Sequence, residues 1–179
     1  MPSLRETLRE TICQAVRGAT AEELMSIVLV LADDEMARAE LVPTAAAVRT
    51  NGRQFALRHD DEVVLDCSTG LMWSRAELTQ DRLTWADADK LCRELRLGGY
   101  SDWRLPTIDE LFALADRTRH EPAIDTTFFP GCKPNAYWAG TPYAPSPGDC
   151  AWGVGFYNGL AHWFHRDYNG FVRAVRASQ

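Results

Sequence analysis

The sequence predicts an α+β protein: a helical segment over residues 1–45, followed by a domain over residues 52–179 that combines short strands with two helices. Two observations lead to this class. The first fifty residues repeat apolar side chains at helical spacing, whereas the later chain alternates short apolar runs with Gly, Pro, Asn and Asp. A length of 179 residues allows one domain with a helical appendage or two small domains, since a typical domain has about 150 residues.

The composition is that of an ordinary folded protein. Hydrophobic residues make up 46% of the chain and charged residues 25%, which disfavours a fibrous or wholly disordered protein. Nineteen Lys and Arg against 25 Asp and Glu give a formal net charge of -6. This charge would repel a phosphate backbone, and no basic stripe offsets it, so we expect no nucleic-acid partner.

The sequence shows neither a membrane span nor an export signal. The longest apolar run covers residues 24–32, whereas a helix that spans a bilayer needs about 20 apolar residues. The first residues alternate charged and apolar side chains, unlike the basic end and apolar stretch of a secretory signal. We therefore expect a cytoplasmic protein with no membrane partner.

The five cysteines are an odd number and form no C-x-x-C pair, which argues against a complete disulfide framework and against a zinc ribbon. We expect free, mostly buried thiols. If the protein were exported, Cys132 and Cys150 would be the first pair to test for a disulfide bond. The sequence predicts no metal site and no cofactor.

The segment over residues 1–45 is predicted to form two or three short helices. Apolar side chains recur every four residues over positions 4–16, and Thr20 with Glu23 has the spacing of a capping box that starts a second helix. Short helices need a partner surface, because most of their stability comes from packing. We interpret the segment as a docking or oligomerisation element for a partner protein or a second copy, or alternatively as a cover for the following domain. An Ala- and Thr-rich linker is expected over residues 44–51.

The main domain begins with a predicted β-hairpin. Strands over residues 54–58 and 63–66 flank a polar stretch that would form the connecting loop. A Ser-Thr-Gly turn at residues 68–70 then leads to a third short strand at residues 71–73. These segments predict a small antiparallel sheet.

Two helices follow, and both carry start signals. Thr84 with Asp87 three residues later begins a helix that Gly98-Gly99 ends. Thr107 with Glu110 begins a second helix, predicted over Ile108–Ala115.

The last third of the chain is predicted to be strands and turns. The strand candidates cover residues 137–140, 151–157, 160–165 and 171–176. Asn158-Gly159 predicts a tight turn before the third of these strands. On that strand the side-chain alternation would place His162, Phe164 and Arg166 on one face and Trp163, His165 and Asp167 on the other.

Several motifs of the main domain occur together in one known family. They are Thr69-Gly70-Leu71-Met72-Trp73, Trp85-Ala86-Asp87-Ala88, Gly99-Tyr100-Ser101-Asp102-Trp103-Arg104-Leu105-Pro106, Tyr137-Trp138-Ala139-Gly140-Thr141-Pro142-Tyr143, Ala151-Trp152 and Val172-Arg173-Ala174-Val175-Arg176. In this order and spacing, from about Val63 to Arg176, the chain resembles the bacterial family typified by the C-terminal domain of collagen-like adhesins, the Lcl C-terminal domain. The long run around Trp103 is highly specific.

This resemblance implies a fold similar to C-type lectins and formylglycine-generating enzymes: a small, irregular, mainly antiparallel sheet with two helices and long loops. Families with this fold include adhesin tips, binding domains diversified by retroelements in phages and bacteria, and an oxidase. The fold therefore leaves the function open.

Seven residues of the motifs are predicted to brace the scaffold. Trp103 offers a large apolar body whose N–H needs a partner when buried, and Asp102 and Arg104 can fix neighbouring loops through charged hydrogen bonds. The same structural role is expected of Trp73, Trp85, Trp138 and Trp152.

The segment over residues 155–170 is the predicted ligand-facing patch. Rigid Tyr, Trp and His side chains beside Asn, Asp and Arg give contact area at little entropic cost. In retroelement-diversified relatives the variable binding residues lie in the corresponding region. The candidates are Tyr157, Asn158, His162, Phe164, His165, Arg166, Asp167, Tyr168 and Asn169, with Tyr143 and Asp149 at the border. The alternative is that every second residue is core and the others are ordinary hairpin surface.

We expect a non-enzymatic binding module that recognises a protein or a glycan, and it is a candidate for a retroelement-diversified variable protein. One alternative is a phage or mobile-element inhibitor or adaptor that directs the acidic residues 33–35 and 60–62 toward a basic host protein. Calcium-dependent lectin activity is not expected, because Asp167 and Asn169 supply too few oxygen ligands.

A second alternative is an oxidase related to formylglycine-generating enzymes. Such an enzyme needs a close pair of reactive cysteines that holds copper. Cys132 and Cys150 are eighteen positions apart with no third ligand nearby in the sequence. His162 and His165 would point to opposite faces of their strand. We therefore predict no catalytic residues.

Overall fold

The computed structural model describes residues 44–50 and 53–178. The chain divides into two compact units, Met1–Val48 and Arg49–Gln179, and the architecture below is that of the second unit with its leading strand. The helices predicted between residues 4 and 41, and with them the proposed docking segment, lie outside the described residues. Within the described part of the chain, no helix has the length and apolar character needed to cross a membrane.

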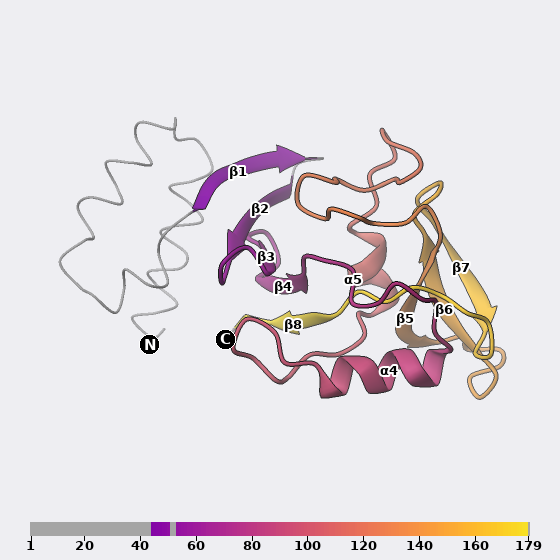
Figure 1. Cartoon of the computed structure of the whole chain (residues 1–179). Helices are drawn as coiled ribbons and strands as arrows, with labels where there is room; N and C mark the ends of the chain where they lie inside the picture. The colour runs from indigo at the N-terminus through magenta and orange to yellow at the C-terminus, as the bar shows by residue number, and fades with distance from the viewer. Residues whose placement is uncertain (1–43, 51–52, 179) are drawn as a thin grey trace, which may run out of the picture. The chain divides into compact units, whose positions relative to one another are not determined.

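Two sheets of antiparallel strands and two short helices make up the described chain, which confirms the α+β class (Figure 1). The first sheet has the order β1-β2-β3-β4-β8, from strands β1 (Thr44–Thr50), β2 (Arg53–Arg58), β3 (Val63–Asp66), β4 (Leu71–Ser74) and β8 (Val175–Ala177). The second has the order β5-β6-β7, from β5 (Ala136–Pro142), β6 (Cys150–Gly155) and β7 (Leu160–His165). The helices are α4 (Trp85–Glu94) and α5 (Ile108–Phe112).

Both helices begin at the predicted caps. The Thr84 side chain accepts a hydrogen bond from the Asp87 N–H at the start of α4. Thr107 and Glu110 form a full capping box at the start of α5. Helix α5 ends at Phe112 and is shorter than predicted, because i→i+3 hydrogen bonds from Leu114 to Leu111 and from Ala115 to Phe112 replace the α-helical pattern.

The structure has a strand in each region where the sequence predicted one, but several of the predicted boundaries were wrong. The hairpin of β2 and β3 has the predicted antiparallel pairing, from Phe55↔Asp66 to Arg58↔Val63. The predicted linker over residues 44–51 instead contains β1, where β-branched Thr and Val favour an extended backbone. Of the predicted strand over residues 171–176, only the end joins a regular ladder.

The expectation of one irregular sheet is also corrected, because the strands form two. Strands β5, β6 and β7 pair with one another, whereas β8 returns to β4. The second sheet carries one register shift, between Trp138 and Pro142 in β5. The segment 171–176 connects the two sheets.

This connecting segment exchanges backbone hydrogen bonds with three elements in turn. Phe171 donates to the Ala136 carbonyl at 2.8 Å and accepts from the Trp138 N–H at 3.0 Å. Ala174 then accepts from the Ser74 N–H at 3.0 Å, and Val175 exchanges two bonds with Arg104. One short stretch of backbone is thereby fixed to both sheets.

Arg173 lies in this segment and its side chain is fully buried. Its guanidinium donates to the Ser74 and Arg75 carbonyls at 2.6 and 3.0 Å and to Glu77 Oε1 at 2.7 Å. The same group lies over the Phe129 ring at 4.8 Å. A buried charge is tolerated only when it is paired and hydrogen-bonded, and these contacts supply both conditions.

The long motif around Trp103 joins loops to the sheets. Asp102 accepts two hydrogen bonds from Arg176, at 2.7 and 3.2 Å. The buried Trp103 indole donates to the Leu97 carbonyl at 3.2 Å. Arg104 donates to both carboxylate oxygens of Glu110, at 2.8 and 2.7 Å, so it holds the capping residue of α5.

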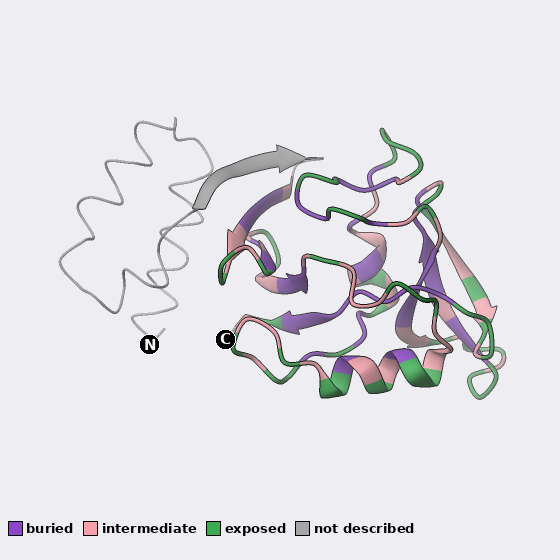
Figure 2. Cartoon of the chain, in the orientation of Figure 1, coloured by how far each residue is buried: buried purple, intermediate pink, exposed green. Residues whose placement is uncertain are grey.

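Apolar side chains form two buried clusters, and Figure 2 shows buried residues along the strands of both sheets. The first contains Trp73, Leu111, Tyr137 and Val154 and includes side chains from both sheets and α5. The second contains Ala88 and Cys92 of α4 with side chains of β3, β4 and β5. Strands β5 and β6 are mostly buried, whereas β7 is half-buried and exposed in alternation.

The buried Arg173–Glu77 pair gives a first prediction. Arg173→Met leaves Glu77 buried without its cation, so we expect the free energy of unfolding to fall by about 3–5 kcal/mol. Arg93→Met removes the pair of exposed Arg93 with half-buried Asp89 and should change the free energy of unfolding by less than about 0.5 kcal/mol. Urea unfolding followed by tryptophan fluorescence measures both. Equal losses in the two variants would show that Arg173 does not have this role.

The Asp102–Arg176 contact gives a second prediction. The hydrogen bond from Arg176 is the largest cause that lowers the pKa of Asp102 below its ordinary value of 3.8. The Asp102 carboxyl therefore binds a proton less readily in the folded state than in the unfolded state. The contact stabilises the fold above about pH 3.8, and this contribution is lost as the pH falls through the lowered pKa. Asp102→Asn should reduce stability at neutral pH and flatten its acid-side decline. A thermal-unfolding series from pH 2 to 7 tests this, and an unchanged profile would contradict it.

Candidate functional site

The predicted patch is built on the hairpin of β6 and β7 and the turn that follows it. The two strands pair in continuous register from Cys150↔His165 to Gly155↔Leu160. The expected two-residue turn at Asn158-Gly159 is instead a loop over residues 156–159, in which Gly155 accepts hydrogen bonds from the N–H groups of Asn158 and Gly159. Gly159 adopts φ 72° and packs against Ala123 and Ala115, where a Cβ would come within 3.3 and 3.5 Å.

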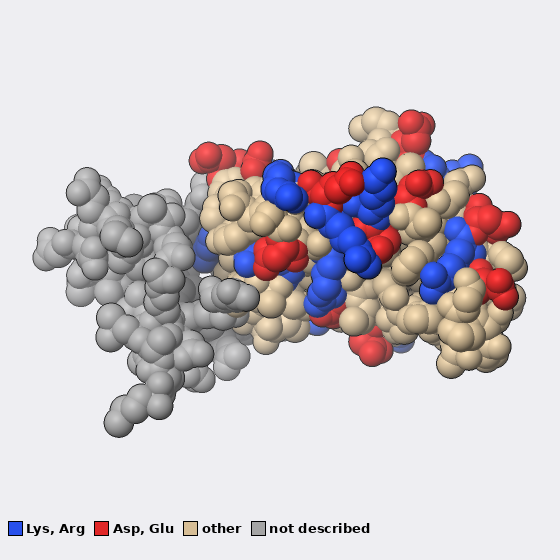
Figure 3. All heavy atoms as spheres, turned by 90° about the horizontal axis from the view of Figure 1, so that it is seen from below, with Lys and Arg blue, Asp and Glu red and all other residues tan. Residues whose placement is uncertain are grey.

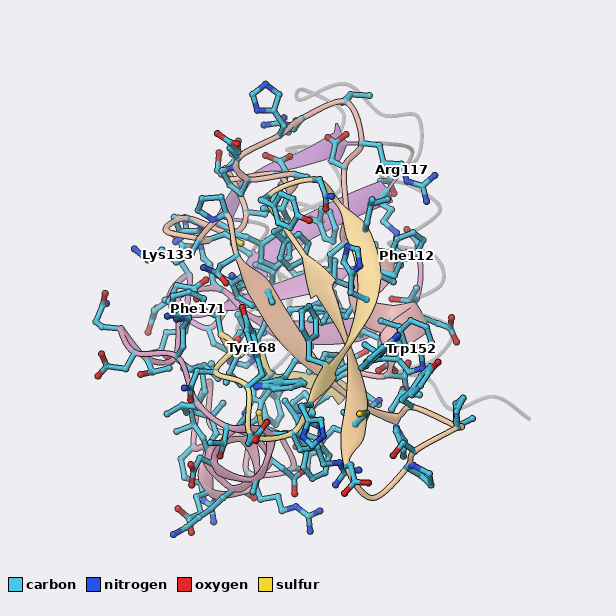
Figure 4. The ribbon with its side chains drawn as sticks, turned by 90° about the vertical axis from the view of Figure 1, so that its right-hand side faces the viewer. Phe112, Arg117, Lys133, Trp152, Tyr168 and Phe171 are labelled. Carbon is cyan, nitrogen blue, oxygen red and sulfur yellow. The ribbon has the colours of Figure 1, made fainter. Side chains whose placement is uncertain are left out.

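Side chains of β7 alternate between two faces as predicted. His162, Phe164 and Arg166 are half-buried, whereas Trp163, His165 and Asp167 are exposed. In Figure 4 the labelled Trp152 lies with Phe112 on one side of the three-stranded sheet, and Tyr168 lies on the other. Trp152 pairs directly with Trp163 across the ladder, so the exposed side chains of β7 share the face that carries Trp152.

The inward face of β7 is packed on the scaffold. The Phe164 ring lies 5.9 Å from Trp138, in an edge contact, and 5.0 Å from Tyr168, in a stacked contact. Gly153 leaves room for this ring, because a Cβ there would lie 3.2 Å from Phe164 and 2.5 Å from the Tyr137 carbonyl oxygen. His162 lies beside Phe164, and its Nε2 is buried without a partner among the described residues.

Arg166 also belongs to the scaffold contacts. Its guanidinium lies over the Trp85 ring at 3.9 Å and donates to the Pro147 carbonyl at 2.9 Å. Trp85 in turn donates its backbone N–H to Arg166 and its indole N–H to Ala139. The side chain thus ties the end of β7 to the start of α4 and to the loop before β6.

The outward face carries three aromatic rings in contact. The Tyr143 and Trp163 rings are stacked at 5.1 Å with an interplanar angle of 17°. Tyr143 also meets Trp152 edge-on at 5.5 Å. Trp163 remains 51% exposed. We refer to Tyr143, Trp152 and Trp163 as the outer aromatic patch.

Polar side chains lie in the segments around this patch. His165 Nδ1 is 3.2 Å from Asp167 Oδ1, and both side chains are mostly exposed. Asp149 accepts a hydrogen bond from Ser146 at 3.0 Å, which orders the loop before β6. Asn158 uses its side chain within the hairpin loop, where it accepts from the Leu160 N–H. Asn169 is exposed on the following turn.

The large hydrophobic side chains that are exposed among the described residues all lie between positions 157 and 168. They are Tyr157, Leu160, Trp163 and Tyr168, with exposed fractions of 46%, 45%, 51% and 38%. Trp163 and Leu160 were not among the predicted ligand residues. The alternation rule put Trp163 on the face opposite Phe164, but it did not say which of the two faces is exposed.

The groups considered for metal binding do not converge. Cys132 and Cys150 are both buried free thiols, and burial raises the pKa of Cys132. Cys132 points its thiol toward the Lys133 carbonyl at 3.9 Å. Among residues 44–50 and 53–178 there is no group of three His, Cys, Asp or Glu side chains placed to hold a metal ion.

An α+β domain whose three-stranded sheet packs on both faces and leaves a partly exposed aromatic patch beside Trp152 is the class that this geometry defines. The family model of the Lcl C-terminal domain matches residues 62–176. The chain therefore belongs to the Lcl C-terminal domain family, as the motifs around Trp103 and Trp138 had indicated. No curated protein matches the chain.

The two faces of β7 give a third prediction. Phe164→Ala removes a ring that packs on Trp138 and Tyr168, and we expect it to lower the free energy of unfolding by about 2 kcal/mol. Trp163→Ala removes a ring that is 51% exposed and should cost less than about 1 kcal/mol. Chemical denaturation of both variants measures the difference. A larger loss for Trp163→Ala would contradict the assignment of the faces.

Proposed function

We propose that this domain is a non-enzymatic ligand-binding module with a C-type-lectin-like fold, and that it recognises a protein or a glycan through the outer aromatic patch and the hairpin beside it. One observation carries the proposal: the exposed large hydrophobic side chains of the described residues are confined to positions 157–168. Of these side chains, Trp163 belongs to the outer aromatic patch, and an exposed aromatic patch with polar neighbours is typical of a binding site.

The chemistry of the patch suits recognition. Tyr143 and Trp163 are already stacked, so a ligand that contacts them meets rings whose rotamers are restricted before binding. Aromatic rings supply contact area, while His165, Asp167 and Asp149 offer donors and acceptors around them. This combination fits the apolar face of a sugar ring or an apolar side chain of a protein.

Three features support the C-type-lectin-like fold. The family assignment covers residues 62–176. The two helices each follow a capping Thr and pack beside antiparallel strands. Long stretches without regular strands, such as residues 113–135, connect the elements.

The proposal extends to a retroelement-diversified variable protein. Tyr157, His165, Asp167 and Asn169 are exposed, so exchanges at these positions would disturb few internal contacts. Tyr168 is also exposed, but its ring packs on Phe164 and Trp138. The inward residues Phe164 and Arg166 would vary less freely, because they contact Trp138 and Trp85. The segment over residues 1–45, which the sequence predicts to be helical, remains the proposed element for a partner protein or for oligomerisation.

The face that carries α4 has charges of both signs and no basic stripe that would attract nucleic acid. Figure 3 shows Lys and Arg side chains interleaved with Asp and Glu over the face that carries α4. Arg93, for example, is paired with Asp89 on this helix. The alternative of an acidic inhibitor has less support, because Glu62 is used internally as an acceptor for the Gly98 N–H.

The fourth prediction tests the binding function. We expect the full chain to bind at least one member of a panel of immobilised neutral and acidic oligosaccharides and extended peptides. Trp163→Ala should weaken that interaction at least tenfold, about 1.4 kcal/mol, as expected for an aromatic anchor. The control Arg93→Ala, on exposed α4 surface, should leave it unchanged.

Surface plasmon resonance with each immobilised panel member measures these affinities. Binding that persists at wild-type strength in Trp163→Ala, Tyr157→Ala and His165→Ala would contradict the proposed site. Absence of binding to every member of the panel would contradict the proposed function for both ligand classes.

A further inference from the structure

One face of the hairpin presents a row of alternate side chains from β7 and the residues that follow it. Trp163 lies opposite Trp152 and His165 opposite Cys150 in the ladder with β6, and His165 Nδ1 is 3.2 Å from Asp167 Oδ1. Side chains two positions apart on a strand project to the same face at a spacing of about 7 Å. Trp163, His165 and Asp167 therefore lie side by side, and we refer to them as the β7 row.

The Trp163 ring is an aromatic platform with one accessible face. Tyr143 stacks on it at a centroid distance of 5.1 Å and an interplanar angle of 17°, which covers one face of the indole. Trp163 is nevertheless 51% exposed, so the accessible part is the opposite face and the edge of the ring. Tyr143 also meets Trp152, and these contacts restrict the rings before a ligand arrives.

Trp163 is separate from the other exposed hydrophobic side chains of the hairpin. Strand alternation, a ring over Gly155 and a stacked contact with Phe164 place the other three on the inward face. These three are Leu160, Tyr157 and Tyr168. A protein interface of standard size covers about 800 Å² on each partner and centres on several packed anchor side chains. A single ring face is too small for such a centre, but it matches one sugar ring, whose C–H groups form an apolar face.

The rest of the β7 row suits hydroxyl groups. The His165 and Asp167 side chains are 62% and 84% exposed, so their polar atoms can exchange hydrogen bonds with a ligand that lies on Trp163. A carboxylate accepts hydrogen bonds at several lone pairs, and a neutral imidazole both donates and accepts. The neighbouring hydroxyl groups of a sugar use this mixture, whereas an apolar side chain of a peptide leaves it unused.

The charges of the β7 row favour a neutral sugar over an acidic one. A carboxylate or sulfate group on the sugar would lie near the Asp167 carboxylate, and it would need an Arg or Lys partner. The nearest cation in the sequence, Arg166, projects to the inward face. There its guanidinium lies over Trp85 and donates to the Pro147 carbonyl. Arg166 is therefore directed away from the β7 row.

We propose that the β7 row, supported by Tyr143, binds one neutral hexopyranose unit. The apolar face of the sugar lies on the accessible face of Trp163, and its hydroxyl groups exchange hydrogen bonds with His165 and Asp167. This assignment rests on the proposed function and names the class of ligand for it. A site of one ring and two polar side chains contacts few ligand atoms, so we expect dissociation constants on the order of 1 mM.

The fifth prediction uses the indole N–H signals of the full chain in a nitrogen–proton correlation spectrum. The sequence has six Trp residues, and Trp163→Phe identifies the signal of Trp163 by its loss. Methyl β-galactopyranoside or methyl β-glucopyranoside, added up to about 50 mM, should shift this signal in a saturable manner. The signals of the buried Trp73 and Trp103 should not move, so they serve as internal controls.

Three variants separate the parts of the site. Saturation-transfer difference spectra of the methyl hexosides measure the affinity where the Trp163 signal is missing. Trp163→Ala should weaken binding at least tenfold. Asp167→Asn should weaken it about threefold, because a neutral amide accepts weaker hydrogen bonds than a carboxylate. The control Tyr157→Ala removes an exposed ring of the inward face and should leave the affinity unchanged. The remaining indole signals show whether each variant is folded.

The outcomes distinguish this inference from the proposed function. Peptides that bind through Trp163 while neither methyl hexoside shifts its signal would overturn the sugar site and leave the binding function in place. Stronger binding of a methyl glucuronide than of the neutral hexosides would overturn the neutral class. Loss of affinity in Tyr157→Ala but not in Trp163→Ala would overturn the assignment to the β7 row. Absence of binding to the sugars and to the peptides alike would contradict both.

Discussion

The buried guanidinium of Arg173 is the constraint on which the described fold depends. The segment 171–176 passes between two sheets and must satisfy its backbone groups on both sides. Arg173 fixes the path of this segment. The charge of Arg173 can be buried only where the Ser74 and Arg75 carbonyls and the Glu77 carboxylate all accept hydrogen bonds from its guanidinium. A shift of this segment by one residue would put the charge among apolar side chains of the core.

The same constraint positions the hairpin of β6 and β7. Between β7 and Arg173 the chain is held by Arg166 on Trp85 and by Gly170, whose backbone exchanges two hydrogen bonds with Leu83. Trp138 then connects the same region to the core, since its indole donates to the Leu83 carbonyl and its ring contacts Tyr168. Aromatic side chains that are exposed but held in place in this way lose little entropy when a ligand binds.

Local signals in the sequence predicted much of the fold, and the errors arose where distant residues decide. The caps at Thr84 and Thr107 depend on side chains three residues away, so their spacing was sufficient. The division into two sheets depends on Val175 pairing with Trp73 across the chain, and no local pattern shows that. The stacking of Tyr143 on Trp163 joins residues from different segments. Alternation could place Trp163 on the face opposite Phe164, but it could neither tell which face is exposed nor supply the partner ring that fixes Trp163.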